Sequence, residues 1–213
     1  MDQTVQWILA GLLVSAVGYL LGSINSSIII SRLVVHQDIR TMGSGNAGGT
    51  NVLRNLGVVP LVLVVVLDLA KTAAAVLLGG FFFPILGADW MLGACIGGFF
   101  TVIGNIYPLF FGFKGGKAVL TSAIIILLLN PFFFLALFLE FFLVLFISRM
   151  VSFSSITVAS SFPVFVLIYS AIKGEFSIPL IIFSILVAFI IVIRHKSNIE
   201  RMRNGTERKI GKK

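Results

Sequence analysis

The stretch at residues 57–82 reads GVVPLVLVVVLDLAKTAAAVLLGGFF, and it decides the fold class of this chain. Only Asp68 and Lys71 interrupt its run of apolar and small side chains, and its length exceeds the roughly 20 residues that a helix needs to cross a bilayer. A membrane β-barrel would show short segments of alternating polarity instead. The stretch therefore predicts a transmembrane helix.

The composition extends this conclusion to the whole chain. Of its 213 residues, 58% are hydrophobic and only 11% are charged, and Phe alone occurs 21 times. A soluble domain of this size has too little interior to bury that much apolar surface. We therefore expect an all-α integral membrane protein that crosses the bilayer several times.

Cysteine and histidine are too scarce for a disulfide framework or a metal centre. Cys95 is the only cysteine, and the two histidines, His36 and His195, have no carboxylate cluster beside them. The sequence predicts no metal and no other cofactor.

Apolar runs continue on both sides of residues 57–82. The first run lacks a basic flank and a small-residue cleavage site and extends beyond signal-peptide length, so we expect a retained first helix. About seven spans near the usual length of roughly 20 residues are expected, some of them shorter. They cover approximately residues 5–31, 57–82, 90–112, 117–130, 132–148, 155–172 and 176–194.

The connections between these spans alternate between basic and non-basic. Basic residues occur in the first, third and fifth connections and after the last span, so the positive-inside rule places these segments in the cytoplasm and the N-terminus outside. All the polar, glycine-rich loops then share one face, which favours a single site on the cytoplasmic face.

The end of the sequence forms a basic tail. Residues 194–213 contain eight basic and two acidic residues, a net charge of +6. We interpret the tail as a cytoplasmic segment that contacts anionic lipid, because no aromatic platform accompanies its charges and no nucleic-acid partner is indicated. Residues 1–213 are expected to form one transmembrane catalytic domain that includes this tail.

Small residues recur at regular spacing along two of the expected helices. Gly18 and Gly22, like Gly93 and Gly97, have the GxxxG spacing that lets helices pack closely. Ser23 continues the first of these stripes, but it approaches the cytoplasmic end of its helix and is therefore also a candidate binding residue.

The segment that precedes residues 57–82 has the opposite character. Residues 43–54 read GSGNAGGTNVLR, a dense polar and glycine-rich loop in an apolar chain. Glycine lets the backbone turn its N–H groups inward at positive φ, which we expect at Gly45 and Gly48, and the polar side chains add donors. This combination suits a phosphate. The candidate binding residues are Ser44, Gly45, Asn46, Gly48, Gly49, Thr50, Asn51 and Arg54.

A second polar segment, residues 104–118, reads GNIYPLFFGFKGGKA. Its KGGK core offers two ammonium groups around a flexible turn, which again suits an anion. The candidate residues here are Asn105, Lys114, Gly115, Gly116 and Lys117.

Two shorter segments complete the set. Residues 152–155 read SFSS, and on a helix Ser152 and Ser155 are three apart and share a face. In the segment RHKSN, which follows the last span, His195 and Asn198 have the same spacing.

Each segment also has a simpler interpretation. A glycine-rich loop is often only a turn, and lysines or a histidine at a membrane boundary often serve as anchors. Ser152, Ser154 or Ser155 can cap the N-terminus of the following helix. These interpretations weaken because all four segments are expected on one face.

Three charged residues lie inside apolar runs. Asp68 and Lys71 are three apart, so an ion pair is the natural interpretation, although the pair could also orient a loop residue from beneath. Glu140 is alone in its span and could be protonated, face a polar interior or meet Lys71.

Together the four polar segments resemble a known family. GSGNAGGTNVLR, GNIYPLFFGFKGGKA, SFSSI and RHKSNIERMRNGTERKIGKK occur in the order and spacing of the bacterial acyl-phosphate:glycerol-3-phosphate acyltransferases of the PlsY family, and the resemblance spans essentially the whole chain. It implies an enzyme of the bacterial plasma (inner) membrane that acylates glycerol 3-phosphate at position 1 and releases phosphate, in phospholipid synthesis. The implied partners are acyl-phosphate, glycerol 3-phosphate and membrane lipid.

The resemblance also implies roles for individual residues. The loop at residues 44–48 would bind the phosphate of acyl-phosphate. The residues that would hold glycerol 3-phosphate or support the transfer are Arg54, Lys117, Ser155, His195 and Asn198.

Two positions depart from the family pattern. Asn105 stands where the family usually has histidine, and Ala118 stands where it usually has glycine. Because asparagine cannot shuttle a proton, we expect a structural hydrogen-bond role for Asn105. Ala118 is expected to stiffen the turn after Lys117.

The expected reaction is direct transfer of the acyl group. No serine–histidine–acid triad is evident, and an acyl-phosphate is a mixed anhydride with a good leaving group, so positioning and charge stabilisation would suffice. The main rival is a transporter of a phosphorylated solute, which could also use glycine-broken helices and a cation. The absence of an internal repeat and the one-sided clustering count against it, and a structural scaffold leaves the polar loops unexplained.

Overall fold

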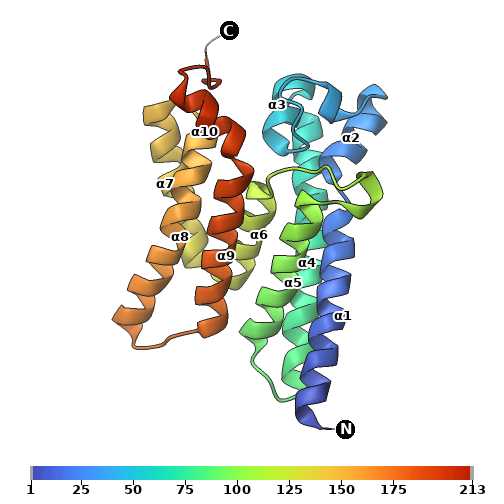
Figure 1. Ribbon diagram of the computed structural model, residues 1–213, viewed down its shortest axis with the longest axis vertical. Helices are drawn as coiled ribbons and strands as arrows, with labels where there is room; N and C mark the ends of the chain where they lie inside the picture. The colour runs from blue at the N-terminus through green and yellow to red at the C-terminus, as the bar shows by residue number, and fades with distance from the viewer. Residues whose placement is uncertain (1, 212–213) are drawn as a thin grey trace. The chain divides into compact units, whose positions relative to one another are not determined.

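The computed structural model describes residues 2–211, and every regular element in that range is a helix (Figure 1). The chain divides into two compact units, unit 1 up to Leu129 and unit 2 from Asn130 onward.

Unit 1 contains three long helices, three shorter ones and two single turns of 3-10 helix. In chain order these elements are α1 (Gln3–Ser23), α2 (Ser26–Val35), η1 (Ile39–Thr41), α3 (Gly49–Leu56), α4 (Val58–Ile85), α5 (Trp90–Ile106), η2 (Leu109–Phe111) and α6 (Val119–Leu129).

Small residues bring α1, α4 and α5 into close contact. A Cβ atom built on Gly18 or Gly22 of α1 would overlap the backbone of Gly97 or Thr101 in α5. The Thr101 hydroxyl, 2.8 Å from the Gly97 carbonyl oxygen, hydrogen-bonds within its own helix at the same contact. The GxxxG spacing is therefore confirmed as a helix-packing pattern.

The first expected span, residues 5–31, is interrupted where α1 ends and α2 begins. Asn25 caps α2 with its side chain. The Lys71 ammonium of α4 lies 2.6 Å from the carbonyl oxygen of Ile24 and 2.7 Å from the Asp68 carboxylate, which also accepts a hydrogen bond from Ser26. The predicted ion pair is confirmed, and it supports this helix break.

Unit 2 contains α7 (Pro131–Ser148), α8 (Val151–Lys173), α9 (Ile178–Arg194) and α10 (Lys196–Arg203). Aromatic edge contacts join α7 to α8, since the Phe133 ring meets both Phe162 and Tyr169. Glu140 of α7 accepts a hydrogen bond from Ser161 of α8, with 2.6 Å between the oxygen atoms. Of the three interpretations of Glu140, the structure therefore gives it a polar partner inside the unit.

The number of spans differs from the expected seven. Within residues 2–211, five helical segments are long and apolar enough to cross a membrane, or six if α9 and α10, which meet at 56°, count as one span. The expected span at residues 117–130 contains only α6, with 11 residues. A helix of that length covers about half of a bilayer core of roughly 30 Å.

Polar segments gather at one end of each unit. In unit 1 the Trp7 indole donates to the Leu86 carbonyl oxygen at 2.8 Å, so the start of α1 lies beside the α4–α5 connection. The segments before α3 and before α6 lie at the opposite end (Figure 1). In unit 2 the Ile210 N–H donates to the carbonyl oxygen of Arg149, which joins the tail to the α7–α8 connection. The expected clustering is therefore present within each unit.

Candidate functional site

The glycine loop, residues 43–48, connects η1 to α3. Gly43 and Gly45 have φ values of 53° and 71°, which few other residues adopt readily. Gly48 has a φ of −150° and is the N-cap of α3. Positive φ is thus confirmed at Gly45, whereas the expectation for Gly48 was wrong because its backbone is extended.

Asn51 holds this loop in shape. Its buried side chain accepts a hydrogen bond from the Ser44 N–H and donates to the carbonyl oxygens of Ile39 and Met42, each at 3.0 Å. Asn55, one turn later, donates to the Asn51 side-chain oxygen at 2.9 Å. Asn51 therefore shapes the loop from behind, and Asn55 is a supporting residue that the sequence analysis missed.

The first turn of α3 presents donors beside the loop. Gly48 gives it no side-chain cap. The positive end of the helix dipole and the first N–H groups, at Gly49 and Thr50, therefore suit an anion. Thr50 and Arg54 are exposed one turn apart on the same face. Within residues 2–211 Arg54 forms no ion pair.

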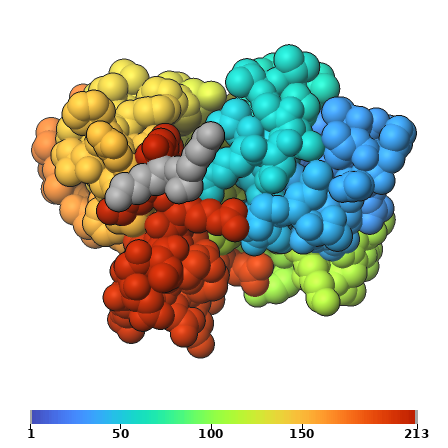
Figure 2. Space-filling view, turned by 90° about the horizontal axis from the view of Figure 1, so that it is seen from above, coloured from blue at the N-terminus to red at the C-terminus, as the bar shows by residue number. Residues whose placement is uncertain are grey.

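The second loop, residues 107–118, folds back onto the end of α5. Gly115 and Gly116 donate their N–H groups to the carbonyl oxygens of Ile106 and Asn105, at 3.0 and 3.2 Å. A Cβ atom on Gly116 would lie 2.5 Å from the Ala47 carbonyl oxygen. The two glycine-bearing loops are thus in contact, which Figure 2 shows in blue and green at this end of unit 1.

The predicted residues of the second loop differ in exposure. Lys114 is exposed and Lys117 is partly buried. Asn105 is buried, and in the described part of the chain only its main-chain carbonyl is hydrogen-bonded to the loop. The structural role expected for Asn105 therefore belongs to its backbone. Ala118 has a φ of 55°, the left-handed conformation for which glycine is suited.

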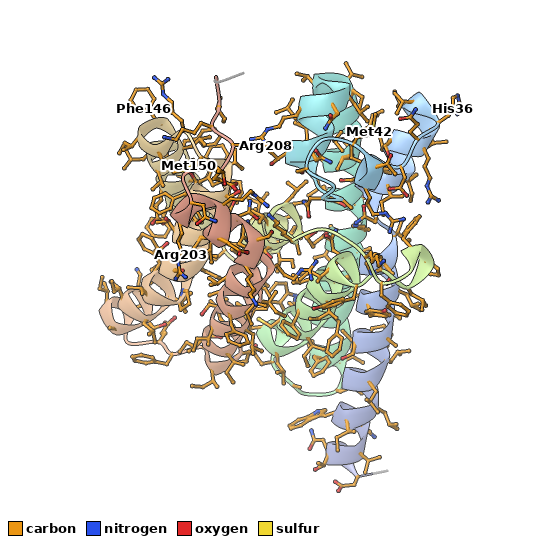
Figure 3. All side chains as sticks on the ribbon, turned by 45° about the horizontal axis from the view of Figure 1, so that its top comes forward. His36, Met42, Phe146, Met150, Arg203 and Arg208 are labelled. Carbon is orange, nitrogen blue, oxygen red and sulfur yellow. The ribbon has the colours of Figure 1, made fainter. Side chains whose placement is uncertain are left out.

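Unit 2 carries a polar cluster at the start of α8 (Figure 3). Ser152 donates to the Glu207 carboxylate at 2.6 Å, and the Asn198 amide donates to both Ser152 and Glu207, at 2.6 and 2.7 Å. Arg201 completes the cluster with an ion pair to Glu207 at 2.8 Å. The tail is therefore folded onto the unit, and Lys212 and Lys213 lie outside the described residues.

Glu207 is the second functional candidate that the sequence analysis missed. Burial raises the pKa of its carboxyl, but hydrogen bonds from Ser152, Asn198 and Arg201 outweigh burial and lower the pKa below the ordinary value. An acid among the many basic residues of the tail, nine residues after Asn198, was the available signal.

The interpretation of the SFSS serines as an N-cap was wrong. Met150 is the N-cap residue of α8, without a side-chain cap bond. The hydroxyls of Ser154 and Ser155 donate to the carbonyl oxygens four residues earlier in the same helix, at 3.0 and 2.9 Å. Both side chains are buried.

His195 lies at the bend between α9 and α10, where it is the C-cap of the first helix and the N-cap of the second. It is buried, and its Nδ1 lies 2.8 Å from the Ile191 carbonyl oxygen, which can only accept, so Nδ1 carries a proton and donates to it. Asn198 donates its N–H to the His195 carbonyl oxygen at 2.8 Å. This bond joins the two residues through their main chain, and the shared face of their side chains stays a prediction.

Two other predictions concern residues outside these clusters. Ser23 is fully buried at the end of α1, where its hydroxyl donates to the Tyr19 carbonyl oxygen at 2.8 Å. A search of the described residues finds no group of three histidine, cysteine or acidic side chains that could hold a metal ion.

An all-helical protein of the membrane, with two glycine-bearing loops that suit phosphate, belongs to the class of membrane-embedded enzymes that act on phosphorylated substrates. The family model described as "Glycerol-3-phosphate acyltransferase" matches residues 12–205. The chain therefore belongs to the glycerol-3-phosphate acyltransferase family.

Relatives and solved structures agree with this assignment. A glycerol-3-phosphate acyltransferase of Streptococcus thermophilus (strain CNRZ 1066) is 40% identical over 203 residues, which cover 92% of this chain and 91% of the relative. The crystal structure of PlsY (YgiH), an integral membrane glycerol 3-phosphate acyltransferase, is 33% identical in its glycerol 3-phosphate form, with a TM-score of 0.84 and coverage of 94% and 96% of the two chains. Its lysophosphatidic acid form is 32% identical, with a TM-score of 0.81 and coverage of 94% and 95%. The chain is an integral, multi-pass membrane enzyme, a glycerol-3-phosphate acyltransferase of the PlsY family.

Proposed function

We propose that this acyltransferase moves a fatty acyl group from acyl-phosphate to the 1-position of glycerol 3-phosphate, giving lysophosphatidic acid and phosphate. The observation that carries the proposal is the contact between the two glycine-bearing loops at one end of unit 1. Two phosphorylated substrates need two adjacent sets of anion-binding groups. The solved relatives with glycerol 3-phosphate and lysophosphatidic acid support the acceptor and the product.

The glycine loop binds the phosphate of acyl-phosphate in this proposal. The start of α3 has no side-chain cap, which leaves the N–H groups of Gly49 and Thr50 for the anion, and Asn51 keeps the adjoining loop in shape. The residues proposed to contact this phosphate are Ser44, Gly45, Asn46, Gly48, Gly49 and Thr50.

Glycerol 3-phosphate is held by cations and amides in this proposal. Arg54 offers a fork of donors from α3, and Lys117 offers a point charge with support from Lys114. Residues proposed to hold glycerol 3-phosphate or support its reaction are Asn105, Gly115, Gly116, Ser155, His195 and Asn198, with Ser23 nearer the acyl chain.

The transfer is direct, without an acyl-enzyme. The hydroxyls of Ser154 and Ser155 are both donated to main-chain carbonyls of α8, where no base is paired with them. Attack of the substrate hydroxyl on the mixed anhydride forms the ester and releases phosphate, whose oxygen or the Nε2 atom of His195 takes the proton.

The site faces the cytoplasm of a bacterial plasma membrane in this proposal. Seven segments cross, with α6 as a short crossing, so that the N-terminus lies outside and the tail inside. The supporting observation is that the basic connections lie at the loop-bearing end of unit 1 and at the tail end of unit 2.

One assay with purified protein tests the donor and the direct transfer. Acyl-phosphate and radiolabelled glycerol 3-phosphate should give lysophosphatidate, whereas acyl-CoA as donor should not. Acyl-phosphate alone should give no phosphate burst and no acylated serine peptide. Uptake of glycerol 3-phosphate by proteoliposomes without acyl transfer would instead favour the transporter.

A further inference from the structure

Arg40 of η1 is a cross-link between the two loops that neither the sequence motifs nor the proposed roles include. Its Nη1 atom donates to the carbonyl oxygens of Phe111 and Lys114, at 2.7 and 2.9 Å. These acceptors lie more than 70 residues away in sequence, in the second loop. The side chain itself is largely buried.

Asp38 fixes the orientation of the Arg40 guanidinium. Its carboxylate accepts from Nε at 3.0 Å and from Nη2 at 2.8 Å, a forked pairing that leaves Nη1 aimed at the second loop. Asp38 also accepts from the Arg40 main chain and from Arg32. Hydrogen bonds from Arg40, followed by those from Arg32, lower the pKa of Asp38 well below its ordinary value. The carboxylate is therefore a permanent anchor.

The bonds from Arg40 flank a strained turn. Between Phe111 and Lys114 the chain passes through Gly112 and Phe113, with φ values of 68° and 59°. A bulky residue rarely adopts this left-handed conformation, so surrounding contacts must hold it. The turn is followed directly by Gly115, Gly116 and Lys117.

We propose that Arg40, oriented by Asp38, is a positioning residue that sets the Lys114–Lys117 turn against the glycine loop. It acts through the turn and does not touch substrate. The inference rests on the proposed function for its kinetic effect. The two hydrogen bonds from Arg40 to the second loop, which we call the Arg40 brace, are a property of the fold. Removing it lets the turn relax and moves the Lys117 ammonium away from its working position.

Arg40→Gln tests the proposal, with Arg32→Gln as the matched control. Both changes remove one positive charge and one ion pair to Asp38, but Arg32 donates no hydrogen bond to the second loop and instead lies over the Phe111 ring, 5.5 Å from its centroid. We expect Arg40→Gln to raise the KM for glycerol 3-phosphate on the order of tenfold with a smaller fall in kcat. Arg40→Lys should be intermediate, because it keeps the charge but not the fork.

A second readout separates the brace from the proposed function. Amide hydrogen exchange across residues 106–118 should accelerate in Arg40→Gln and stay near wild type in Arg32→Gln, with an unchanged unfolding temperature in both. Faster exchange without a KM change would mean that the brace exists but the loop does not bind this substrate. Unchanged exchange, or equal KM effects in the two variants, would overturn the positioning role of Arg40.

Discussion

At the scale of single residues, two positions of the segment 104–118 are unusual in opposite ways. Ala118 carries a Cβ atom into a left-handed conformation, whereas Asn105 uses its backbone for structure and keeps its amide unpaired within residues 2–211. The left-handed conformation of Ala118 costs free energy, and the side-chain amide of Asn105 leaves donors and an acceptor for a ligand. Both stand where the family pattern has another residue.

Ala118→Gly should stabilise the protein. The left-handed conformation costs an alanine roughly 1–2 kcal/mol, and the added chain entropy of glycine offsets about half of that. We expect a net gain of about 0.5–1 kcal/mol, measured as a higher midpoint of thermal unfolding in detergent, with activity retained. Ala118→Val, which adds a branched side chain at the same φ, should lower the midpoint, and equal midpoints for both variants would contradict the strain.

Arg54→Ala should impair use of glycerol 3-phosphate without unfolding the protein, because the side chain is exposed and unpaired in the described structure. Loss of a charge-assisted contact of about 1.5–3 kcal/mol predicts a KM increase on the order of 10- to 100-fold in steady-state kinetics. Arg54→Lys should also be impaired if the contact is forked. Near-normal kinetics in both variants would make Arg54 an interfacial anchor only.

At the scale of elements, apolar runs located the long helices, because burial in lipid requires such runs. The same pattern could not reveal the break between α1 and α2, since the cap from Asn25 and the ammonium of Lys71 come together only in three dimensions. It also gave a span of 117–130 where α6 covers Val119–Leu129, because hydropathy does not reveal that Ala118 turns the chain and that Asn130 caps the next helix.

The candidate site, like the helices, was predictable in part from the sequence. Glycine, lysine and arginine in polar loops of an apolar chain indicated which segments carry chemistry. Arg40 and Glu207 were not indicated because their partners are distant in sequence, and Asn55 was not indicated because it acts by holding the Asn51 side chain.

Glu207→Gln should loosen the attachment of the tail to α8. Replacing the charged acceptor weakens its bonds to Ser152, Asn198 and Arg201, which predicts a loss of about 2 kcal/mol in the free energy of unfolding. The measurement is thermal unfolding as a function of pH. Because folding lowers the pKa of Glu207, its stabilisation is complete above the ordinary value of about 4.3 and is lost as the pH falls through the folded value.

The glutamine variant should therefore be the less pH-sensitive protein in the acid range. Its stability should approach that of wild type as the pH falls through the lowered pKa of the folded carboxyl, where the wild-type side chain becomes protonated. A constant difference between the two proteins from neutral to acid pH would show that the charge of Glu207 is not what stabilises the tail.

At the scale of the whole molecule, orientation in the membrane is the property that a helix bundle alone does not determine. The distribution of basic residues predicts an odd number of crossings, with opposite ends of the sequence on opposite sides. Because α6 has only 11 residues, whether it crosses the membrane decides whether the number of crossings is odd or even.

Single cysteines test the orientation, after Cys95 has been replaced by alanine. A cysteine introduced at Gln3 should react with a membrane-impermeant thiol reagent from outside intact cells. A cysteine at Thr206 should react only when the reagent is admitted to the cytoplasm. Labelling of both positions from one side would require an even number of crossings, and α6 would then be a re-entrant segment.

The anchoring of the tail has a consequence for biosynthesis. The hydrogen bonds of Asn51 to the glycine loop and of Arg40 to the second loop lie within unit 1, so these contacts can form while later residues are still being translated. The cluster at the start of α8 is complete only after synthesis has passed Glu207, 55 residues beyond Ser152, and the backbone contact of Ile210 with Arg149 comes three residues later. Unit 2 thus spends part of its assembly without the carboxylate that accepts from Ser152 and Asn198, and a ribosome stalled before Glu207 would carry a unit 2 whose tail is not yet attached.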